Sequence, residues 1–275
     1  MAVASGAEGD QVQAWATART KKRARLTAEE LREHLLDTAV EILSQSGGLT
    51  VSLAHLNMEE LIRIANVPRS SVYREWKTKE AFYIDLMAKM VEPSLDQGAA
   101  WDQETIDVAV AVIGQYHERL HTADGRRAVL GEAARLAVRQ NFEAVSQSLA
   151  WRTSTALAAT LPALEEGDRE RLLAALRQAE THFIDKMAAF YEQMMPILGL
   201  RPKAPFDLRT FTATASSMIE GLISRSRTNP DVVNHTIMLP GIDGDFVEWH
   251  LSAIGYLAIL DTMIETDPDY STPSS

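Results

Sequence analysis

Apolar residues recur with the period of an α-helix along almost the whole chain, and this pattern limits the fold more than any other feature. Thr27 followed by Glu30 is a capping box that opens the first such segment, residues 27–46. The apolar face behind it consists of Leu31, Leu35, Ala39, Ile42 and Leu43. Further helices are expected at 57–65, 68–75, 78–92, 103–121, 126–140, 141–161, 167–195, 206–226 and 245–266. With few strand candidates and no internal repeat, the chain is predicted to be all-α.

Composition excludes several classes of protein. The chain of 275 residues is 46% apolar and 24% charged, which is ordinary for a globular protein with a substantial core. It contains no cysteine, so disulfides and thiolate chemistry are excluded. There is no apolar run of bilayer length and no secretory n-region or h-region at the N-terminus. We therefore expect a cytoplasmic protein.

Charge is distributed unevenly along the chain. Its formal net charge is −11, yet residues 19–90 carry 12 Lys and Arg against 10 Asp and Glu. Residues 91–275 carry 15 basic against 26 acidic residues. Such asymmetry suggests a front segment that meets a polyanion, followed by an acidic body, although a nearly neutral front segment is an equally simple reading.

The front segment has the order of a helix-turn-helix. A short helix at 57–65 is followed by a turn at Asn66 and by a second short helix that Pro68 opens. The apolar face of the helix at 27–46 supplies the third side of a common core. In such a motif the second helix can lie in the major groove of DNA.

The residues of this segment resemble the TetR family of transcriptional regulators. The stretch L-I-x-x-A-N-V-P-R-S-S-V-Y-R-E-W-K-T-K-E is similar to the family pattern I-A-x-x-A-G-V-S-x-x-T-[LIV]-Y-x-[HY]-F-x-x-K-E, over about residues 28–90. The matching positions are Leu61, Ala65, Val67, Ser71, Val72, Tyr73, Trp76, Lys79 and Glu80. Asn66 replaces the usual turn glycine, Pro68 the usual capping serine, and Trp76 the usual phenylalanine.

The second helix and the start of the next one supply candidate DNA contacts. Arg69, Ser70, Ser71 and Arg74 lie on the second helix and are candidates for base or phosphate contacts. The resemblance implies that the Tyr73 hydroxyl and Lys79 bind phosphate, and Thr78 can add a hydroxyl or backbone N–H. Trp76 is predicted to be a core residue. Lys22 and Arg23, within the basic run 19–25, form either a DNA-binding arm or a solvated charge run.

A competing motif lies at 117–121, where HERLH fits the zinc-binding pattern H-E-x-x-H. On an α-helix His117 and His121 would share a face, and Glu118 would be the general base of a metallohydrolase. No third ligand has a supporting motif, so we expect neither a catalytic residue, nor a metal site, nor a cofactor.

For the larger body, the resemblance implies a ligand-binding and dimerisation module. Aromatic and methionine side chains along its helices are more often simple core, but they are also the candidates for lining a ligand pocket. These candidates are Trp101, Tyr116, His117, Trp151, Phe183, Met187, Phe190 and Tyr191, with Arg135, Gln147 and His182 as further polar groups.

The last two long helices are the candidates for a homodimer interface, which would be a four-helix arrangement. The residues predicted there are Phe211, Ala215, Met218 and Leu222 on one helix, and Phe246, Trp249, Ala253 and Leu257 on the other. The alternative is that these faces only close the core of the protomer.

Together these features predict three regions: a lead with a basic arm at 1–26, a helix-turn-helix unit at 27–92, and a helical ligand-binding and dimerisation unit at 93–275. The function that fits best is a homodimeric repressor that binds a palindromic operator and is released by a small molecule. A metallohydrolase based on HERLH and a helix-turn-helix adaptor without DNA binding remain alternatives.

Overall fold

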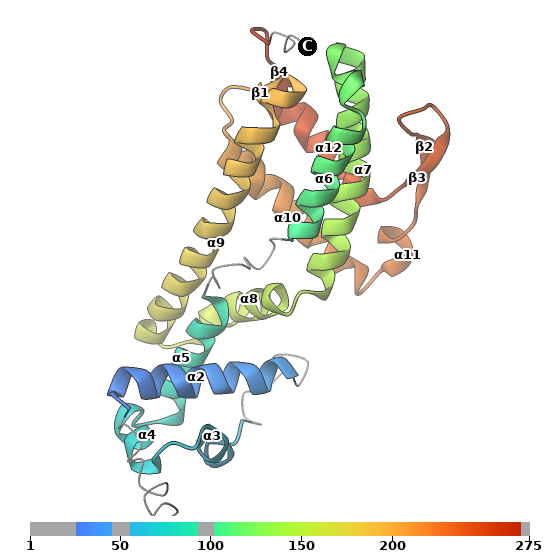
Figure 1. Ribbon diagram of the computed structural model, residues 1–275. Coiled ribbons are helices and arrows are strands. Elements are labelled where there is room, and N and C mark those ends of the chain that lie inside the picture. The colour runs from blue at the N-terminus through green and yellow to red at the C-terminus, as the bar shows by residue number, and fades with distance from the viewer. Residues whose placement is uncertain (1–25, 46–55, 93–101, 271–275) are drawn as a thin grey trace, which may run out of the picture.

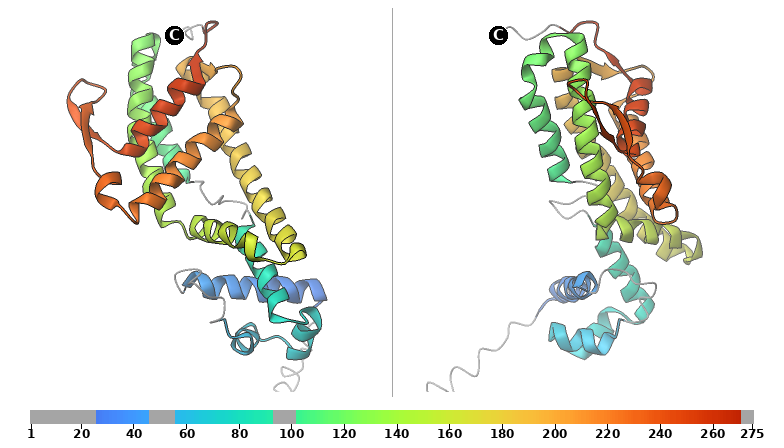
Figure 2. Two further views of the ribbon diagram at one scale, coloured as in Figure 1. Left: turned by 180° about the vertical axis from the view of Figure 1, so that it is seen from behind. Right: turned by 90° about the vertical axis from the view of Figure 1, so that its right-hand side faces the viewer.

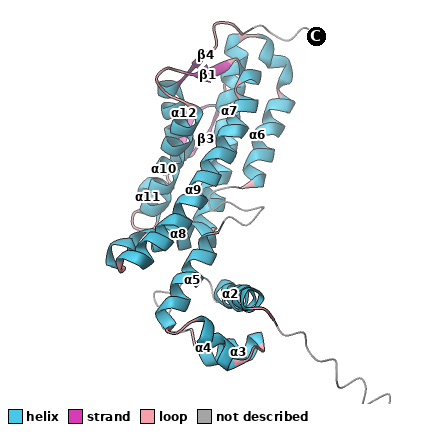
Figure 3. Cartoon of the chain, turned by 90° about the vertical axis from the view of Figure 1, so that its left-hand side faces the viewer, coloured by secondary structure: helices cyan, strands magenta, loops and turns pink. Residues whose placement is uncertain are grey.

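The computed structural model of the chain describes residues 26–45, 56–92 and 102–270, and these residues are mainly helical (Figure 1). The all-α prediction is therefore confirmed. A smaller group of helices, α2 to α5, lies at one end of the molecule, and the helices of the body rise from it as a long bundle (Figure 3). The predicted basic arm at 19–25, with Lys22 and Arg23, lies outside the described residues.

Four helices form the smaller group: α2 (Ala28–Gln45), α3 (Met58–Ala65), α4 (Arg69–Glu75) and α5 (Lys79–Val91). The predicted capping box opens α2, because the Glu30 N–H donates to Thr27 Oγ1 at 3.1 Å and the Thr27 N–H donates to Glu30 Oε2 at 2.7 Å. Leu31 and Leu35 of α2 join Leu61, Val72 and other apolar residues in one buried cluster. The three-helix core predicted for this segment is thus present.

The body contains six longer helices and several short ones. The longer helices are α6 (Gln103–Gln115), α7 (Ala123–Gln147), α8 (Leu149–Thr160), α9 (Glu166–Met194), α10 (Leu208–Ser226) and α12 (Leu251–Met263). The short ones are α11 (Pro230–Val233) and the 3₁₀ helices η3 (His117–His121), η4 (Leu161–Ala163) and η5 (Pro196–Leu198). No helix in the described part of the chain combines the length and the apolar composition needed to cross a bilayer.

Two small antiparallel ribbons accompany the body helices. β1 (Leu200–Pro202) pairs with β4 (Ile264–Thr266), which joins the chain after α9 to the chain after α12. β2 (Ile237–Pro240) pairs with β3 (Phe246–Trp249) as a hairpin that projects from the side of the bundle (Figure 1). The long break predicted at 229–244 is therefore an ordered excursion that contains α11 and β2.

Several predicted helix boundaries are wrong. The helix expected at 245–266 begins only at Leu251, because residues 246–249 pair with β2 and leave the helical path. The break expected at 140 is absent, and α7 instead ends at Ser148, whose extended backbone and hydroxyl cap α8.

The gap between the helices expected at 103–121 and 126–140 contains Asp124 and Gly125, which instead lie in the first turn of α7, where Thr122 caps the Gly125 N–H. A Cβ at Gly125 would lie 1.9 Å from the Arg119 carbonyl oxygen, so glycine is needed here for a close approach and not for a chain reversal.

Helix α5 joins the two groups of helices. It packs against α2 on one side and against α8 and α9 on the other, as the view from behind also shows (Figure 2). Val91 of α5 is buried with Leu157 of α8 and Leu172 of α9. A displacement of α8 or α9 would therefore act directly on the helix that follows the helix-turn-helix.

Candidate nucleic-acid interface and ligand cavity

The turn between α3 and α4 has the geometry of a helix-turn-helix. Asn57 caps the start of α3 by accepting from the Glu59 and Glu60 N–H groups. Asn66 ends the helix in the left-handed conformation, with φ 52° and ψ 47°, as the sequence predicts for a residue that replaces glycine. Buried Val67 and Val72 then fix α4 against the core. The backbone thus places α4 on the outside of the unit.

Helix α4 presents most of the predicted contact residues to solvent. Arg69, Ser70 and Arg74 are exposed, Tyr73 is 39% exposed, and Ser71 is half-buried. Pro68 precedes the first helical residue and provides no side-chain cap, so the α4 N–H groups lack the hydroxyl partner that a serine would supply.

An acidic residue of α3 engages two of these candidates. Glu59 Oε1 lies 2.8 Å from Arg69 Nη2 and accepts a hydrogen bond of 2.9 Å from the Tyr73 hydroxyl. The Arg69 guanidinium also lies 5.5 Å from the centre of the Tyr73 ring. These contacts hold both side chains in place on the exposed face, and a phosphate that bound them would have to compete with the Glu59 carboxylate.

The start of α5 lies beside α4 (Figure 1). The Thr78 hydroxyl caps the helix by accepting from the Ala81 N–H at 3.2 Å, and Lys79 is the exposed first residue of the helix. The hydroxyl proton of Thr78, the Lys79 ammonium and the helix N-terminus are three features that favour an anion.

Trp76 and Asp85 link this surface to the interior. Trp76 is 3% exposed, packs edge-on against Phe82 at 5.1 Å, and donates its indole N–H to Asp85 Oδ2 at 2.7 Å. The core role predicted for Trp76 is confirmed. Asp85 is buried and also pairs with Arg32 of α2 at 2.5 Å and with Arg171 of α9. One carboxylate therefore connects the residue after α4 to both α2 and the body.

The body encloses a cavity of about 1110 Å³ of empty space, part of it open to solvent. Side chains from α6, α7, α9, α10 and α12 line it. Most of them are apolar, among them Phe183, Met187, Phe190 and Met194 along α9. Its mainly apolar lining with a few polar groups is typical of a binding site for a small organic molecule.

The polar groups of the cavity are few. Burial raises the pKa of Tyr191 and of Tyr256, whose hydroxyls are hydrogen-bonded to each other. Glu220 of α10 also lines the cavity, and burial raises the pKa of its carboxyl above the usual range. Asn141, Thr212 and Ser216 supply further hydrogen-bonding groups.

Comparison with known proteins links this arrangement to transcriptional regulators. Over 94 residues the chain is 28% identical to the HTH-type transcriptional repressor NemR of Escherichia coli K12, and equally to NemR of strain O6:H1. The match covers 34% of this chain and 41% of NemR, so the chain spans about two fifths of the length of the curated relatives it matches. No protein-family model matches the chain.

Solved structures similar to this one are also transcriptional regulators. Reduced E. coli NemR aligns with 86% of this chain and 98% of its own at 14% identity and a TM-score of 0.43. A TetR-family regulator from Agrobacterium tumefaciens aligns over 74% and 90% at 13% identity and a TM-score of 0.36. The SmeT–triclosan complex aligns over 89% and 96% at 16% identity and a TM-score of 0.39.

The sequence match to NemR, which is described as an HTH-type transcriptional repressor, agrees with the TetR-family resemblance of residues 28–90 and with the helix-turn-helix geometry of α3 and α4.

Four of the eight residues predicted for a ligand pocket line the cavity. Phe183, Met187, Phe190 and Tyr191 do so, because α9 turns this face toward α7 and α10. Tyr116, His117 and Trp151 do not line it, and neither do the polar candidates Arg135, Gln147 and His182. Trp101 lies outside the described residues. Buried Trp151 instead packs in the protomer core, and Arg135 pairs with Glu132.

Glu220, Tyr256 and Asn141 also line the cavity and were not predicted from the sequence. Each occupies an ordinary helical position, and only the packing of separate helices places it at the cavity. An acidic residue among the apolar residues of α10 was the one available signal, since Ile219 precedes Glu220 and Leu222 follows two positions after it.

The HERLH segment does not have the geometry of a zincin helix. Residues 117–121 form the 3₁₀ helix η3, in which side chains four positions apart point in different directions, so His117 and His121 do not share a face. His117 Nδ1 lies 3.0 Å from the Gly114 carbonyl oxygen. Among the residues that the structure describes, no three His, Cys, Asp or Glu side chains are grouped to hold a metal.

Half of the residues predicted for a dimer interface belong to the core of the protomer. Phe211, Ala215, Trp249 and Ala253 are at most 8% exposed, so they have no surface to offer a partner. Met218, Leu222 and Leu257 are half-buried, and Phe246 is 67% exposed. An interface formed by α10, α12 and the β2–β3 hairpin could therefore use these four partly exposed residues but not the four buried ones.

Proposed function

We propose that the protein is a one-component transcriptional regulator: a homodimeric repressor that binds a palindromic operator and is released by a small molecule in the body cavity. The observation that carries this proposal is the connection, through α5 and Asp85, of an exposed helix-turn-helix to a helical body with an apolar cavity. The similarity to NemR, which is described as a repressor, supports the direction of regulation.

Operator binding would use α4 in the major groove. Arg69 and Arg74 of α4 would contact base edges, where an arginine can form a bidentate contact with guanine. Tyr73, Thr78 and Lys79 would bind the phosphates on either side and fix the orientation of the helix. Ser70 and Ser71 complete the surface, with Ser71 restricted by its partial burial.

Release would pass through the charge cluster around Asp85. Arg171 belongs to α9, the same helix that lines the cavity with Phe183 and Met187 further along. A ligand that displaced α9 would move Arg171 relative to Asp85, and Asp85 holds Trp76 at the end of α4. Since two reading heads on a palindrome must lie about 34–36 Å apart, a change in their separation weakens DNA binding.

Dimerisation would cover apolar surface on α10, α12 and the β2–β3 hairpin. The two helices lie side by side and so close that a Cβ at Gly255 would be 2.9 Å from Met218 Sδ. Helix α12 is apolar around its whole circumference, which is typical of a helix covered on all sides. Ile254 and Leu257 of this helix nevertheless remain half-exposed in the protomer.

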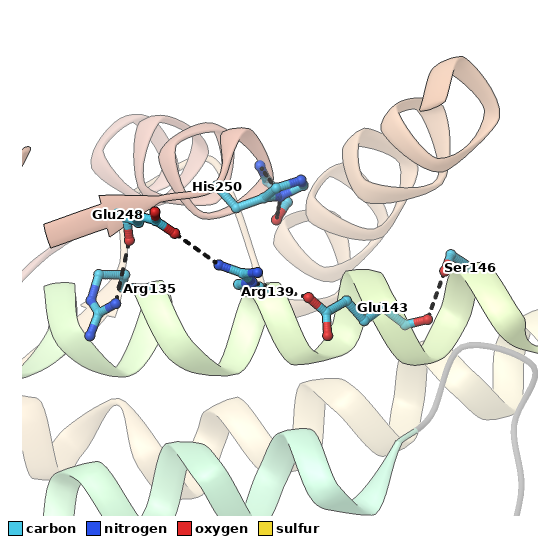
Figure 4. Close-up of polar contacts among 7 residues, drawn as sticks. Arg135, Arg139, Glu143, Ser146, Glu248 and His250 are labelled. Carbon is cyan, nitrogen blue, oxygen red and sulfur yellow. Dashed lines mark hydrogen bonds and ion pairs between the residues drawn. The ribbon is translucent and has the colours of Figure 1, made fainter. Parts of the chain in front are cut away.

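The hairpin is anchored and still apolar on its surface. Arg135 donates to the Glu248 carbonyl at 3.4 Å (Figure 4). Arg119 donates to the Ile242 carbonyl at 2.9 Å, so both ends of the hairpin are tied to the bundle. Met238 and Phe246 are nevertheless 53% and 67% exposed. We infer that the hairpin packs on the second copy, beside α12.

Oligomeric state tests this part of the proposal. Sedimentation equilibrium should show a dimer, and Leu257→Glu or Phe246→Glu should shift it toward monomer. Val110→Glu is a matched control, because Val110 is 47% exposed on α6, away from the proposed interface. A monomeric parent, or equal effects of all three substitutions, would count against the interface.

A salt-titrated binding assay tests the function itself. Double-stranded fragments that the protein selects from a random library should bind in the nanomolar range, and the affinity should fall steeply with salt. The pairing of Glu59 with Arg69 and Tyr73 favours a second candidate, an adaptor whose helix-turn-helix no longer binds DNA. Failure to select any sequence at low salt would favour the adaptor and contradict the repressor.

A further inference from the structure

The body cavity contains acidic groups but no basic one. Among the described residues that line it, the ionisable side chains are two carboxylates and two tyrosines, and no lysine, arginine or histidine is present. The carboxylates belong to Asp102 and Glu220. Asp102 is occupied as the cap of α6, where it accepts from the Glu104 and Thr105 N–H groups and from the Thr105 hydroxyl. Glu220 is therefore the acid that remains for a ligand.

The surroundings of Glu220 leave its charge uncompensated. Burial has the largest effect and raises the pKa of its carboxyl. The indole N–H of Trp151, which lies near this carboxyl, lowers the pKa by less, and the negative charge of Glu180 on α9 raises it by less still. Trp151 is 4% exposed, and its N–H has no hydrogen bond of normal geometry in the described structure. No ion pair of Glu220 with a basic side chain is formed within the described residues.

The rest of the cavity would stabilise a cation. Phe183, Phe190, Tyr191 and Tyr256 line it, and aromatic faces attract a positive charge. An anion would find no cationic partner in a mainly apolar space, and an unpaired buried charge is strongly unfavourable. An apolar cation would instead gain both the aromatic contacts and the Glu220 carboxylate.

We propose that the cavity takes lipophilic monocations, molecules with a bulky apolar body and one delocalised or quaternary positive charge that lies against Glu220. This inference rests on the proposed function for the role of the cavity, but it concerns the ligand class alone. The chain contains no cysteine, so such a ligand would be bound without a covalent bond to a thiol.

Two ions of the same size and shape but opposite charge make the sharpest test. The neutral probe N-phenyl-1-naphthylamine, whose fluorescence rises in apolar surroundings, is bound to the full-length protein and displaced by tetraphenylphosphonium or by tetraphenylborate. The phosphonium should bind at least about tenfold more tightly than the borate, because a charge pair of this kind contributes more than 1 kcal/mol in a partly buried site. Equal affinities, a preference for the borate, or no displacement by either ion would overturn the proposal.

Substitution of Glu220 tests the residue itself. Glu220→Gln keeps the shape of the side chain and should reduce the preference for the phosphonium to less than about threefold. Glu192→Gln is the matched control, since Glu192 is an exposed carboxylate on α9 and outside the cavity lining. A preference that survives in Glu220→Gln would show that another group sets it and would overturn the assignment.

Release of DNA tests the proposed function separately from the charge preference of the cavity. Release of DNA by tetraphenylphosphonium is measured with the same proteins by fluorescence anisotropy. A strong charge preference without release of DNA would support the ligand class and count against a ligand-released repressor. Release of DNA by both ions alike would support the repressor and overturn the ligand class.

Discussion

The helix-turn-helix unit and the body are both built from α-helices, but their candidate binding residues lie on opposite sides of those helices. In α2 to α5 the interior is filled with apolar side chains around one buried charge cluster, and the candidate contact residues point outward. In the body the helices leave an interior cavity, and the candidate binding residues point inward. A surface site can therefore be recognised from polar residues at fixed spacing, whereas a cavity depends on how distant helices pack.

Removing the Asp85 carboxylate should produce the largest effect, a loss of stability. It tests whether the helix-turn-helix unit depends on this buried charge. Asp85→Ala leaves Arg32, Arg171 and the Trp76 N–H without their shared partner, so the free energy of unfolding should fall by about 3–5 kcal/mol. Urea unfolding monitored by tryptophan fluorescence measures it. A loss below about 1 kcal/mol would show that the cluster is not needed for stability.

Substitutions at the predicted phosphate contacts should have the next largest effect, on DNA affinity, and they test whether the outward-pointing residues bind DNA. Tyr73→Phe and Lys79→Ala should each weaken binding about tenfold on any sequence, and Lys79→Ala should lower the salt dependence by about one counterion. Arg69→Ala or Arg74→Ala should in addition relax sequence preference. Glu80→Gln serves as the control for the α5 start, and parental binding by all these variants would contradict the assignments.

A variant at Arg171 tests whether the two regions communicate. Arg171→Ala removes only the link between α9 and Asp85, and its side chain is half exposed, so stability should change by less than about 1 kcal/mol. The affinity for DNA should stay within about twofold of the parent, while the effect of a cavity ligand on that affinity should shrink several-fold. An unchanged ligand effect would show that coupling uses another route.

The smallest expected effect is a gain of function at Glu59. Glu59→Gln removes the negative charge that pairs with Arg69 and should raise DNA affinity about threefold, because an exposed ion pair contributes little. Glu60→Gln, on the same turn but paired with Arg63, is the matched control. A weaker complex with Glu59→Gln would mean that Glu59 positions Arg69 and Tyr73 for binding.

The sequence predicted the features that depend on near neighbours. The capping box at Thr27, the left-handed Asn66 and the buried Trp76 are local effects, and the structure contains all three. The hydrogen bond from Trp76 to Asp85 was not predicted, although it explains why an indole replaces the usual phenyl ring.

Features that depend on distant contacts were predicted less well. Trp151 and Phe211 were read as binding or interface residues because they are large and apolar, and they are core residues instead. Glu220 was not predicted, because its one local signal, an acidic residue among apolar neighbours, does not show that distant helices form a cavity around it. Residues 246–249 were wrongly predicted to be helical as the start of a longer apolar pattern. They pair with β2, and Phe246, Val247 and Trp249 are residue types common in strands.

The proposed repressor requires that binding in the cavity and binding of DNA affect each other. The affinity of a cavity ligand with and without DNA tests this coupling. The dissociation constant of N-phenyl-1-naphthylamine is measured for the free protein and for the protein saturated with selected DNA. If the bound probe weakens DNA binding, DNA must weaken probe binding by the same factor. We expect the dissociation constant of the probe to rise about fivefold or more when DNA is bound, and that of DNA to rise by the same factor when the probe is bound. Identical probe affinities with and without DNA would contradict it.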